Sequence, residues 1–417
     1  MKGEWIERYR KAAKIERNST DVLVGFNANI DEIYSIEDVD IELEDSPAIH
    51  VDQVKDEKDL KSELKYARRE EISEEVELEF DPNLEDGTSR IGGQSGIMSN
   101  FLAQQNNGVI FYTPFLSEEL TAELDEKILY PTIDGGFVLK NVKDAANSDR
   151  TKKNIVIETE GSHRVIFSRK VRGFGPYFRK EVEKNIEDLE KGADTAIFSG
   201  YHDVVGNNEA KLKKAAEQMK KLDLPIHVEF VQRRETDEYV LEHILPEADS
   251  IGLDEAEMHK MADMLDVETD EGSLGEAFAV AKSLIHRKKV SRVHIHTMRY
   301  HVTVTDQDYD ISPAKIRDAM LYGEISAILT ADKGDMPLPE DFKDFDMEGL
   351  HLHKMDELED FESFFQKKGF TETGITEVKG LNVIAIPTLI HEDPEHVVGL
   401  GDIISSASFT AEEHHEN

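Results

Sequence analysis

The feature that most constrains the fold is a regular alternation of short apolar runs with longer amphipathic stretches. The apolar runs have the length of buried strands, and the stretches between them have helical spacing, most clearly at 207–222 and 274–288. Strands separated by helices of this length predict βαβ units and a doubly wound, mostly parallel sheet. The strand candidates are 21–30, 108–115, 154–158, 164–168, 195–200, 225–230, 250–253, 292–298 and 381–387.

Two regions depart from this alternation. Residues 35–89 are strongly acidic, and strands there would be amphipathic, while residues 117–170 contain further short β-like segments. We therefore expect a second, smaller α/β domain that is inserted discontinuously into the sheet domain. The predicted division is a large domain of residues 1–30, 90–116 and 171–417, and a small domain of residues 31–89 and 117–170.

The charge of the chain restricts its partners. It has 88 acidic and 49 basic residues among 417, for a net charge of −39. This balance argues against nucleic acids and anionic membranes, which are bound by Lys and Arg. It favours a surface adapted to a salt-rich cytoplasm.

Cysteine is absent from the sequence, which excludes disulfides and thiolate chemistry. The first twenty residues have an amphipathic helical pattern without the apolar stretch of a signal peptide, and the apolar runs are shorter than the roughly 20 residues that span a bilayer. We expect a cytoplasmic protein that works as a monomer or a small homo-oligomer.

A glycine-rich turn precedes the last apolar helix, in "VVGLGDIISSASF" at 397–409. Gly399, Gly401 and Asp402 lie where a helix start exposes unpaired N–H groups and attracts anions. One interpretation is that Asp402 caps the helix. The other is that the amides hold a phosphoryl group while Asp402 removes a proton beside it.

The first predicted strand ends in "GFNANIDEIY", 25–34. Asn27, Asn29 and Asp31 alternate, so they share one face of an extended chain and are suited to bind hydroxyl groups. The alternative is a turn in which these side chains bind their own backbone.

A second glycine turn, "RIGGQSGIMSN" at 90–100, opens a helix. Gly92 and Gly93 allow a ligand close to the backbone, and Gln94 can both donate and accept.

Acidic residues follow two further strands. His227 and Glu229 project from the same side of the strand "HVEF", and a buried Glu needs a cation or polar partner to stay ionised. Asp254 and Glu257 share a helical face in "SIGLDEAEM". These acids suit a hydrated Mg²⁺, although Asp254 and Glu257 also match a capping pair.

Histidine and basic clusters are less specific. His294, His296 and His301 have no Cys beside them, so we interpret them as core or supporting residues and not as a zinc site. A basic cluster at 163–180 suits phosphate binding or pairing with the acidic surface. Its members are Arg164, Arg169, Lys170, Arg172 and Arg179.

The motifs, in their order, resemble one family. "GFNANID", "RIGGQSGIMSN", "FSGYHD", "HVEF", "SIGLDEAE", "IHTMRY" and "VVGLGDIIS" look like the ADP-dependent sugar kinases, the archaeal glucokinases and phosphofructokinases, from about residue 21 to about residue 409. The resemblance implies a ribokinase-like fold. The large domain would carry the nucleotide, and the small domain would be a lid over the sugar.

The resemblance also implies roles for individual residues. The sequence departs from the family at Asp254, because the family motif that also contains Glu257 begins with Asn at this position. The resemblance implies Asp402 as the catalytic base with Gly399 and Gly401, Asn29, Asp31, Gly93 and Gln94 as sugar-binding residues, His227, Glu229 and Gly401 as nucleotide-binding residues, and Glu229 and Glu257 as metal-binding residues. From residue type and position we add Arg172 to the catalytic candidates, Glu85 and Arg164 to the sugar-binding candidates, and Asp254 to the nucleotide-binding candidates.

The implied reaction is transfer of the β-phosphoryl group of ADP to fructose 6-phosphate, glucose or both, with Mg²⁺, forming AMP in a modified glycolysis. The basic cluster favours fructose 6-phosphate, and Glu85 favours glucose. The alternatives are an ATP-dependent ribokinase-like sugar kinase and a non-catalytic sugar- or nucleotide-binding sensor.

Overall fold

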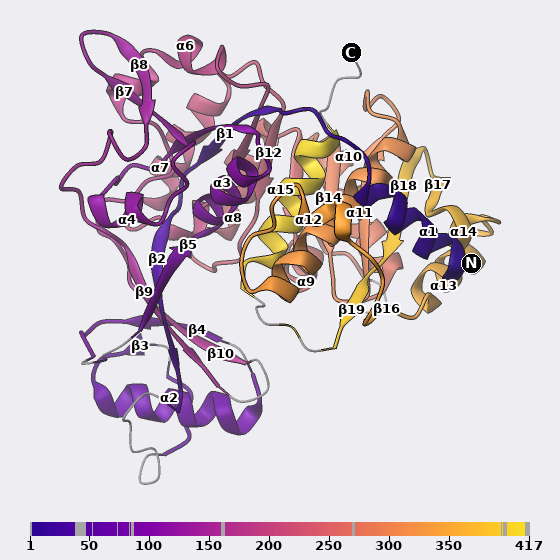
Figure 1. Ribbon diagram of the computed structural model, residues 1–417, viewed down its shortest axis with the longest axis horizontal. Coiled ribbons are helices and arrows are strands. Elements are labelled where there is room, and N and C mark those ends of the chain that lie inside the picture. The colour runs from indigo at the N-terminus through magenta and orange to yellow at the C-terminus, as the bar shows by residue number, and fades with distance from the viewer. Residues whose placement is uncertain are drawn as a thin grey trace.

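The protein consists of a large α/β body and a small lid joined by a narrow waist of strands (Figure 1). The computed structural model describes residues 2–37, 47–51, 53–72, 74–82, 84, 87–159, 163–268, 272–392, 394 and 398–412. Each part is built on its own sheet, of eleven strands in the body and six in the lid. Two short strands, β16 (Leu350–Leu352) and β19 (Leu389–His391), form a separate two-stranded antiparallel sheet beside the body.

The body sheet is parallel in its centre and antiparallel at its edges, as the alternation of strands and helices predicts. Its parallel strands from β14 to β7 bring their carboxyl ends to one edge. In spatial order the strands are β17 (Ile375–Val378), β18 (Leu381–Pro387), β15 (Tyr300–Asp306), β14 (Arg292–His296), β13 (Ser250–Leu253), β12 (Ile226–Glu229), β11 (Thr195–Phe198), β1 (Asp21–Gly25), β6 (Gly108–Tyr112), β7 (Leu129–Ile133) and β8 (Phe137–Asn141).

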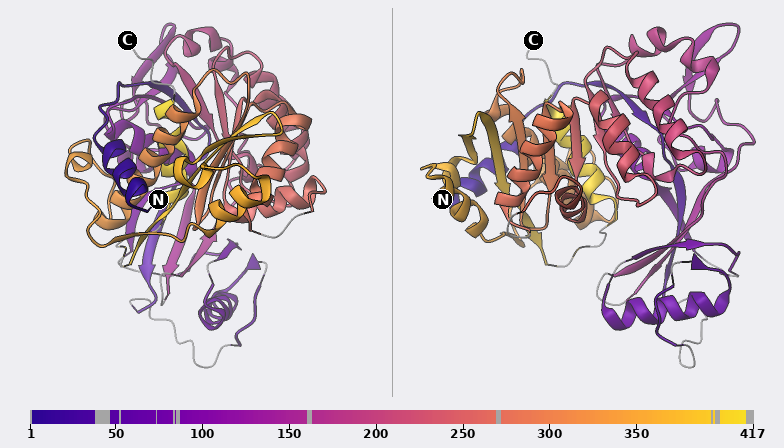
Figure 2. Two further views of the ribbon diagram at one scale, coloured as in Figure 1. Left: turned by 90° about the vertical axis from the view of Figure 1, so that its right-hand side faces the viewer. Right: turned by 180° about the vertical axis from the view of Figure 1, so that it is seen from behind.

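Helices cover both faces of this sheet (Figure 2). In β1, Val22 and Val24 pack into one apolar cluster and Leu23 into another, because successive side chains of a strand point to opposite faces. The first cluster contains α3 (Gln94–Gln104) and residues of α15 (Leu400–Glu412). The second contains residues of α1 (Lys2–Ala13), α7 (Asn208–Met219), α9 (Glu255–Met264), α10 (Leu274–Lys288), α11 (Pro313–Lys333) and α13 (Asp356–Phe365). Of these helices, α11 also packs along α15, on the same face of the sheet.

The lid sheet has a single long helix, α2 (Glu57–Glu70), packed on one face. Asp56 caps this helix by accepting bonds from the Lys58 and Asp59 amides. Leu60, Leu64 and Ala67 form its buried stripe. The sheet order is β3 (Gln53–Val54), β4 (Glu74–Leu78), β10 (Arg164–Ser168), β9 (Lys153–Glu158), β2 (Asn29–Ser35) and β5 (Thr88–Gly92).

The strands correct the predicted domain boundaries in three places, and the first is β5, which lies in the lid sheet although residues 90–92 were expected in the large domain. The run 21–30 is not one strand: β1 ends at Gly25 in the body, and β2 starts at Asn29 in the lid. Residues 129–141, expected in the lid, form β7 and β8 at the edge of the body sheet. Their sequence gives the same β signal in either sheet, and only the pairing of β7 with β6 decides between them.

Potassium chloride at molar concentration is expected to stabilise the fold. The net charge of −39 makes the surface self-repelling, and salt screens that repulsion. The midpoint of thermal unfolding should rise by at least about 2 °C between 0.1 M and about 2 M KCl, the shift that about 1 kcal/mol produces in domains of this size. Sorbitol at matched osmolality serves as the uncharged control. An unchanged midpoint in KCl would contradict the predicted adaptation to salt.

Candidate active site

The glycine turn at 399–402 begins helix α15, with Asp402 in its first turn. Gly399 has a positive φ of 72°, which favours glycine, and a side chain there would collide with Ile97. A Cβ at Gly401 would lie 2.6 Å from His296 Nε2, so the absence of a side chain lets α15 approach the sheet. Asp402 itself is half-buried and keeps contact with solvent. Burial, together with the Glu229 and Asp254 carboxylates, raises its pKa well above the ordinary range.

The face of the sheet beneath α15 is polar, whereas its opposite face is apolar. Side chains at alternate positions of β12, β13 and β14 face α15, where His227 stacks on Phe409 with ring centroids 4.8 Å apart. His227 Nε2 lies 2.5 Å from Glu229 Oε1, and both side chains are almost fully buried. Gly252, paired with Glu229 across the strands, has no side chain and leaves room for that carboxylate.

The ionisation of this pair follows from its burial. Burial lowers the pKa of His227, although Glu229 opposes the shift. Burial alone would raise the pKa of Glu229, but the contact with His227 holds it below its ordinary value. The pair is therefore a neutral imidazole that donates from Nε2 to an ionised carboxylate. His227 is thus the polar partner that a buried, ionised Glu229 was expected to need.

Asp254 and Glu257 form the capping box that was one of the two interpretations of their spacing. Asp254 Oδ1 accepts from the Glu257 amide at 2.7 Å, and Glu257 Oε2 accepts from the Asp254 amide at 2.8 Å. Burial and the Asp254 carboxylate raise the pKa of Glu257 well above its usual range, with smaller contributions from Glu229 and Asp402. The four carboxylates thus form one electrostatically coupled cluster at the carboxyl edge of the sheet.

This acidic cluster fits a hydrated divalent cation. Its carboxylates repel one another in a buried setting, which a positive ion would relieve. Within the described part of the chain, no three of them bring ligand atoms close enough to share one ion directly. An ion held through water by one or two carboxylates and by substrate phosphates is the usual arrangement for Mg²⁺.

A second polar cluster lies where the chain crosses from the body to the lid. Asp31 Oδ1 accepts from Asn29 Nδ2 at 2.5 Å and from Asn154 Nδ2 at 3.0 Å. Burial raises the pKa of Asp31, against the effect of these two amides and Lys152. A side chain at Gly92 would collide with Asn29 and Asp31, so the glycine turn and this carboxylate belong to one site.

Neighbouring residues of the two motifs also meet. Asn27 Nδ2 donates to Gln94 Oε1 at 3.3 Å, and Asn27 Oδ1 accepts from the Ser199 hydroxyl at 2.6 Å. Gly93, with φ of 73°, packs against Ala28 and Asn29. The alternative of a self-satisfied turn is therefore wrong, because these side chains bind other segments of the chain.

Each of these clusters borders a cavity between the lid and the body. One of about 470 Å³ is lined by Asp31 and Arg90 of the lid strands and by Val398 and Ile403 at the start of α15. The other, of about 900 Å³, lies between the lid strands β4 and β10 and the carboxyl edge of the body sheet. Its lining includes Glu77, Lys170, Arg233, Asp254 and Glu257.

Most of the basic cluster at 163–180 pairs with acidic neighbours. Arg169 binds Asp81, Lys170 Nζ lies 2.7 Å from Glu77 Oε2, and Arg179 Nη2 lies 3.3 Å from Asp149 Oδ2. For these three residues, the structure agrees with the alternative that the basic cluster pairs with acidic side chains.

The remaining basic candidates lie in different surroundings. Arg164 is half-buried near Asp31 and Glu158; burial lowers its pKa, and the two carboxylates oppose the shift. Arg172 is exposed in the segment that returns to the body. The predicted sugar residue Glu85 lies outside the described residues.

The three histidines lie together in the core beneath α15. His294 Nδ1 is 2.9 Å from Thr303 Oγ1, and His301 Nε2 is 2.7 Å from Glu324 Oε2. Burial lowers the pKa of His294 well below its usual range. In the described chain these histidines do not form a group with metal-ligand spacing. Burial places His294 and His301 in the core, whereas His296 is half-buried next to Gly401.

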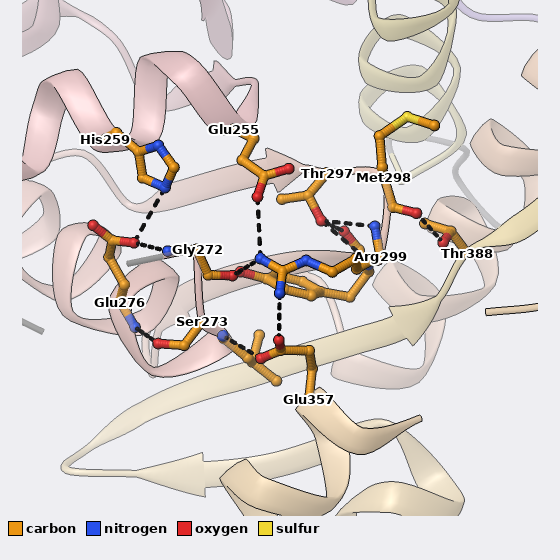
Figure 3. Close-up of polar contacts among 12 residues, drawn as sticks. Glu255, His259, Gly272, Ser273, Glu276, Thr297, Met298, Arg299, Glu357 and Thr388 are labelled. Atoms are coloured by element: carbon orange, nitrogen blue, oxygen red, sulfur yellow. Dashed lines mark hydrogen bonds and ion pairs between the residues drawn. The ribbon is translucent and has the colours of Figure 1, made fainter. Parts of the chain in front are cut away.

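Arg299, which the sequence did not single out, contacts the start of α9 (Figure 3). Arg299 Nη2 lies 3.1 Å from Glu255 Oε1, and Nη1 lies 2.6 Å from Glu357 Oε1 on α13. It also donates to the Gly272 carbonyl. Because Glu255 follows Asp254 directly, this arginine positions the capping box. The sequence contains one indication of its role, since Arg299 is a basic residue in the motif "IHTMRY" of an acidic chain. Its partners could not be predicted, because Glu255 and Glu357 lie far from it in the sequence.

Comparisons with known proteins agree with this architecture. A solved structure described as "ADP-dependent kinase complex with fructose-6-phosphate and ADPbetaS" superimposes with a TM-score of 0.84 at 25% identity, over 99% of this chain and 98% of that one. The ADP-specific phosphofructokinase of Pyrococcus abyssi is 29% identical over 374 residues, which cover 81% of each chain. The ADP-dependent glucose/glucosamine kinase of Pyrococcus furiosus is 27% identical over 457 residues, which cover 98% of each.

The two sheets, with the glycine turn at the start of α15, define a doubly wound α/β protein with the fold of the solved ADP-dependent kinase, in agreement with the resemblance of the motifs. The model of the family described as "ADP-specific Phosphofructokinase/Glucokinase conserved region" matches residues 20–411. The chain belongs to this family of enzymes. Among the helices of the described residues, none is both long enough and apolar enough to cross a membrane.

Proposed function

We propose that the chain transfers the β-phosphoryl group of ADP to fructose 6-phosphate, glucose or both, and releases AMP. The observation that carries this proposal is the position of Asp402, which lies half-buried in the first turn of α15, directly before Ile403, and Ile403 lines the same cavity as Asp31. Relatives that are named for both sugars support it.

Each cluster has a part in the proposed reaction. Asn29, Asp31 and Gln94 bind the hydroxyl groups of the sugar, and Asp402 removes the proton from the hydroxyl that attacks. The turn amides around Gly399 and Gly401 stabilise the charge that spreads over the transferred group. A raised pKa suits a base that must accept a proton near neutral pH.

The lid excludes water from this reaction. Closure over the body suppresses transfer of the phosphoryl group to water instead of sugar. Arg164, near Asp31, and the exposed Arg172 are the basic residues proposed to contact substrate phosphates.

Glu229 and Glu257 would hold Mg²⁺ through water, and Asp254, in place of the family's Asn, adds a fourth carboxylate to the cluster. When bound, Mg²⁺ neutralises the donor phosphates and makes the phosphoryl group easier to transfer. We place the enzyme in a salt-rich cytoplasm, in a modified glycolysis, as a monomer or small homo-oligomer without nucleic-acid or membrane partners.

A matrix of donors and acceptors tests the proposal. Initial rates are measured in high KCl with ADP or ATP as the donor and fructose 6-phosphate or glucose as the acceptor, and AMP is quantified. We expect AMP formation with ADP and at least one sugar. Activity with ATP alone would favour a ribokinase-type enzyme, and binding of nucleotide and sugar without turnover would favour a sensor. Either result would overturn the proposal.

A further inference from the structure

Three side chains with metal-ligating atoms meet inside the lid, away from the proposed active site. His50 comes from the segment before β3, Glu63 from α2 and Glu74 from the start of β4. His50 Nδ1 lies 3.2 Å from Glu63 Oε1 and 3.1 Å from Glu74 Oε2. One ligand atom from each residue lies within 4.8 Å of the other two.

The position of the Glu63 carboxylate is fixed by the backbone. Its side chain is fully buried, and Oε2 accepts a hydrogen bond from the Val51 amide at 2.7 Å. The other oxygen, Oε1, is thereby directed at His50. Such a hydrogen bond to the non-coordinating atom is how proteins commonly orient metal ligands.

The contacts around His50 are not satisfied by hydrogen bonds alone. An imidazole Nδ1 carries at most one hydrogen, so it can donate to only one of the two carboxylates. Glu74 Oε2 is buried and has no hydrogen-bond partner among the described residues, although His50 Nδ1 is nearby. Two carboxylates and a ring nitrogen thus surround one small volume.

The spacing matches the edges of a coordination shell. Ligands bound to Zn²⁺ at about 2.1 Å are separated by roughly 3.0 to 3.4 Å in octahedral or tetrahedral geometry. The two distances from His50 Nδ1 lie in that range. One imidazole with two carboxylates suits Zn²⁺ and similar transition metals better than Mg²⁺ or Ca²⁺, which prefer oxygen ligands alone.

We propose that His50, Glu63 and Glu74 bind a divalent transition-metal ion of the Zn²⁺ type inside the lid. The ion fastens α2 and β4 to the segment before β3, and so stabilises a domain whose own apolar core is small. The His50 side chain is 44% exposed, which gives the ion a path from solvent. The site is independent of the proposed kinase reaction, because its residues do not belong to the carboxylate cluster beneath α15.

Titration of the metal-stripped full chain with Zn²⁺ tests the site. Isothermal titration calorimetry should show one fewer bound equivalent of Zn²⁺ for Glu63→Gln and for His50→Gln than for the wild type. Any Zn²⁺ that binds the active-site carboxylates contributes equally, because these carboxylates are present in the wild type and in both variants. Zn²⁺ should also raise the thermal unfolding midpoint of the wild type more than that of either variant. With Co²⁺ as the probe, the visible absorption of the wild type should weaken in both variants.

Glu70→Gln is the matched control, because Glu70 lies exposed on the same helix and its substitution removes the same charge. This control should bind as the wild type does. If Glu63→Gln does not fold, the partly exposed His50 still provides a test. Equal stoichiometry and affinity in wild type and His50→Gln would overturn the proposal. Failure of the kinase assay would not affect it, since metal binding is measured without substrates.

Discussion

Substitution of Asp402 with alanine is expected to lower kcat by about 10²- to 10⁴-fold, the usual contribution of a general base. The carboxylate lies in the first turn of α15, where removal of a half-buried side chain leaves the packing of Ile403 and Ala407 intact. Initial rates of AMP formation measure the loss. Circular dichroism and the thermal midpoint confirm that the variant is folded.

Thr410→Val provides a matched control in the same helix. It replaces a buried hydroxyl that has no hydrogen-bond partner among the described residues with a methyl group of similar size. This variant should retain wild-type rates. An Asp402→Ala enzyme with more than a tenth of the wild-type kcat would contradict the assignment of the base.

The pH profile gives an independent check of this assignment. Because burial, Glu229 and Asp254 raise the pKa of Asp402, kcat/KM should rise with pH at values above the ordinary aspartate range of about 4. The base is active only when deprotonated, so activity falls as pH drops below the raised pKa. This dependence should be missing from the residual activity of Asp402→Ala.

Substitution of Glu412 with leucine is expected to lower the free energy of unfolding by about 3 to 5 kcal/mol. Glu412 and Arg292 are both fully buried and form a bidentate ion pair, with distances of 2.8 Å and 2.7 Å. Loss of the carboxylate leaves the guanidinium charge buried without its counter-charge. Urea denaturation followed by fluorescence and circular dichroism measures the change.

The double variant Glu412→Leu/Arg292→Leu separates the cost of a lone charge from the value of the pair. Without any buried charge it should recover part of the lost stability, because apolar replacements of buried ion pairs are often tolerated. A loss below about 1 kcal/mol in the single variant would show that water reaches this pair.

The ion pair also supports the candidate site through a chain of hydrogen bonds. Arg292 Nη1 donates to Ser250 Oγ at 2.9 Å, and Ser250 Oγ lies 2.7 Å from His227 Nδ1. His227 in turn donates to Glu229. Helix α15 is therefore tied to the same polar face at two points, through Ser405 Oγ, which lies 3.3 Å from His227 Nε2, and through Glu412 at its end.

The sequence predicted the central strands well because their signal is local. A buried parallel strand needs only a short apolar run, and β11, β12 and β13 lie within the predicted runs 195–200, 225–230 and 250–253. The prediction of one strand over 21–30 was wrong. The chain passes from one sheet to the other at residues 26–28, and the apolar pattern of the sequence does not mark this point. Edge strands β7 and β8 were assigned to the wrong sheet because pairing with β6 is a long-range property.

Candidate site residues were found where an unusual residue type breaks a local pattern. Asp31 and Glu229 are acids in apolar strands, and the structure buries both. Asn154 and Arg299 were missed because an amide or arginine in a strand or turn is ordinary until its distant partners are known. For the same reason the sequence did not distinguish Arg169 and Lys170, which pair with lid carboxylates, from phosphate-binding residues.

The waist between the two sheets has a mechanical consequence for the lid. Asp31, Gly92 and Asn154 lie on the strands that cross this waist, so they are close to any axis about which the lid turns (Figure 1). A small rotation there is amplified with distance, as at the end of a lever. A fluorophore on α2 would therefore sweep a wide arc on substrate binding, whereas one beside Asp31 would scarcely be displaced.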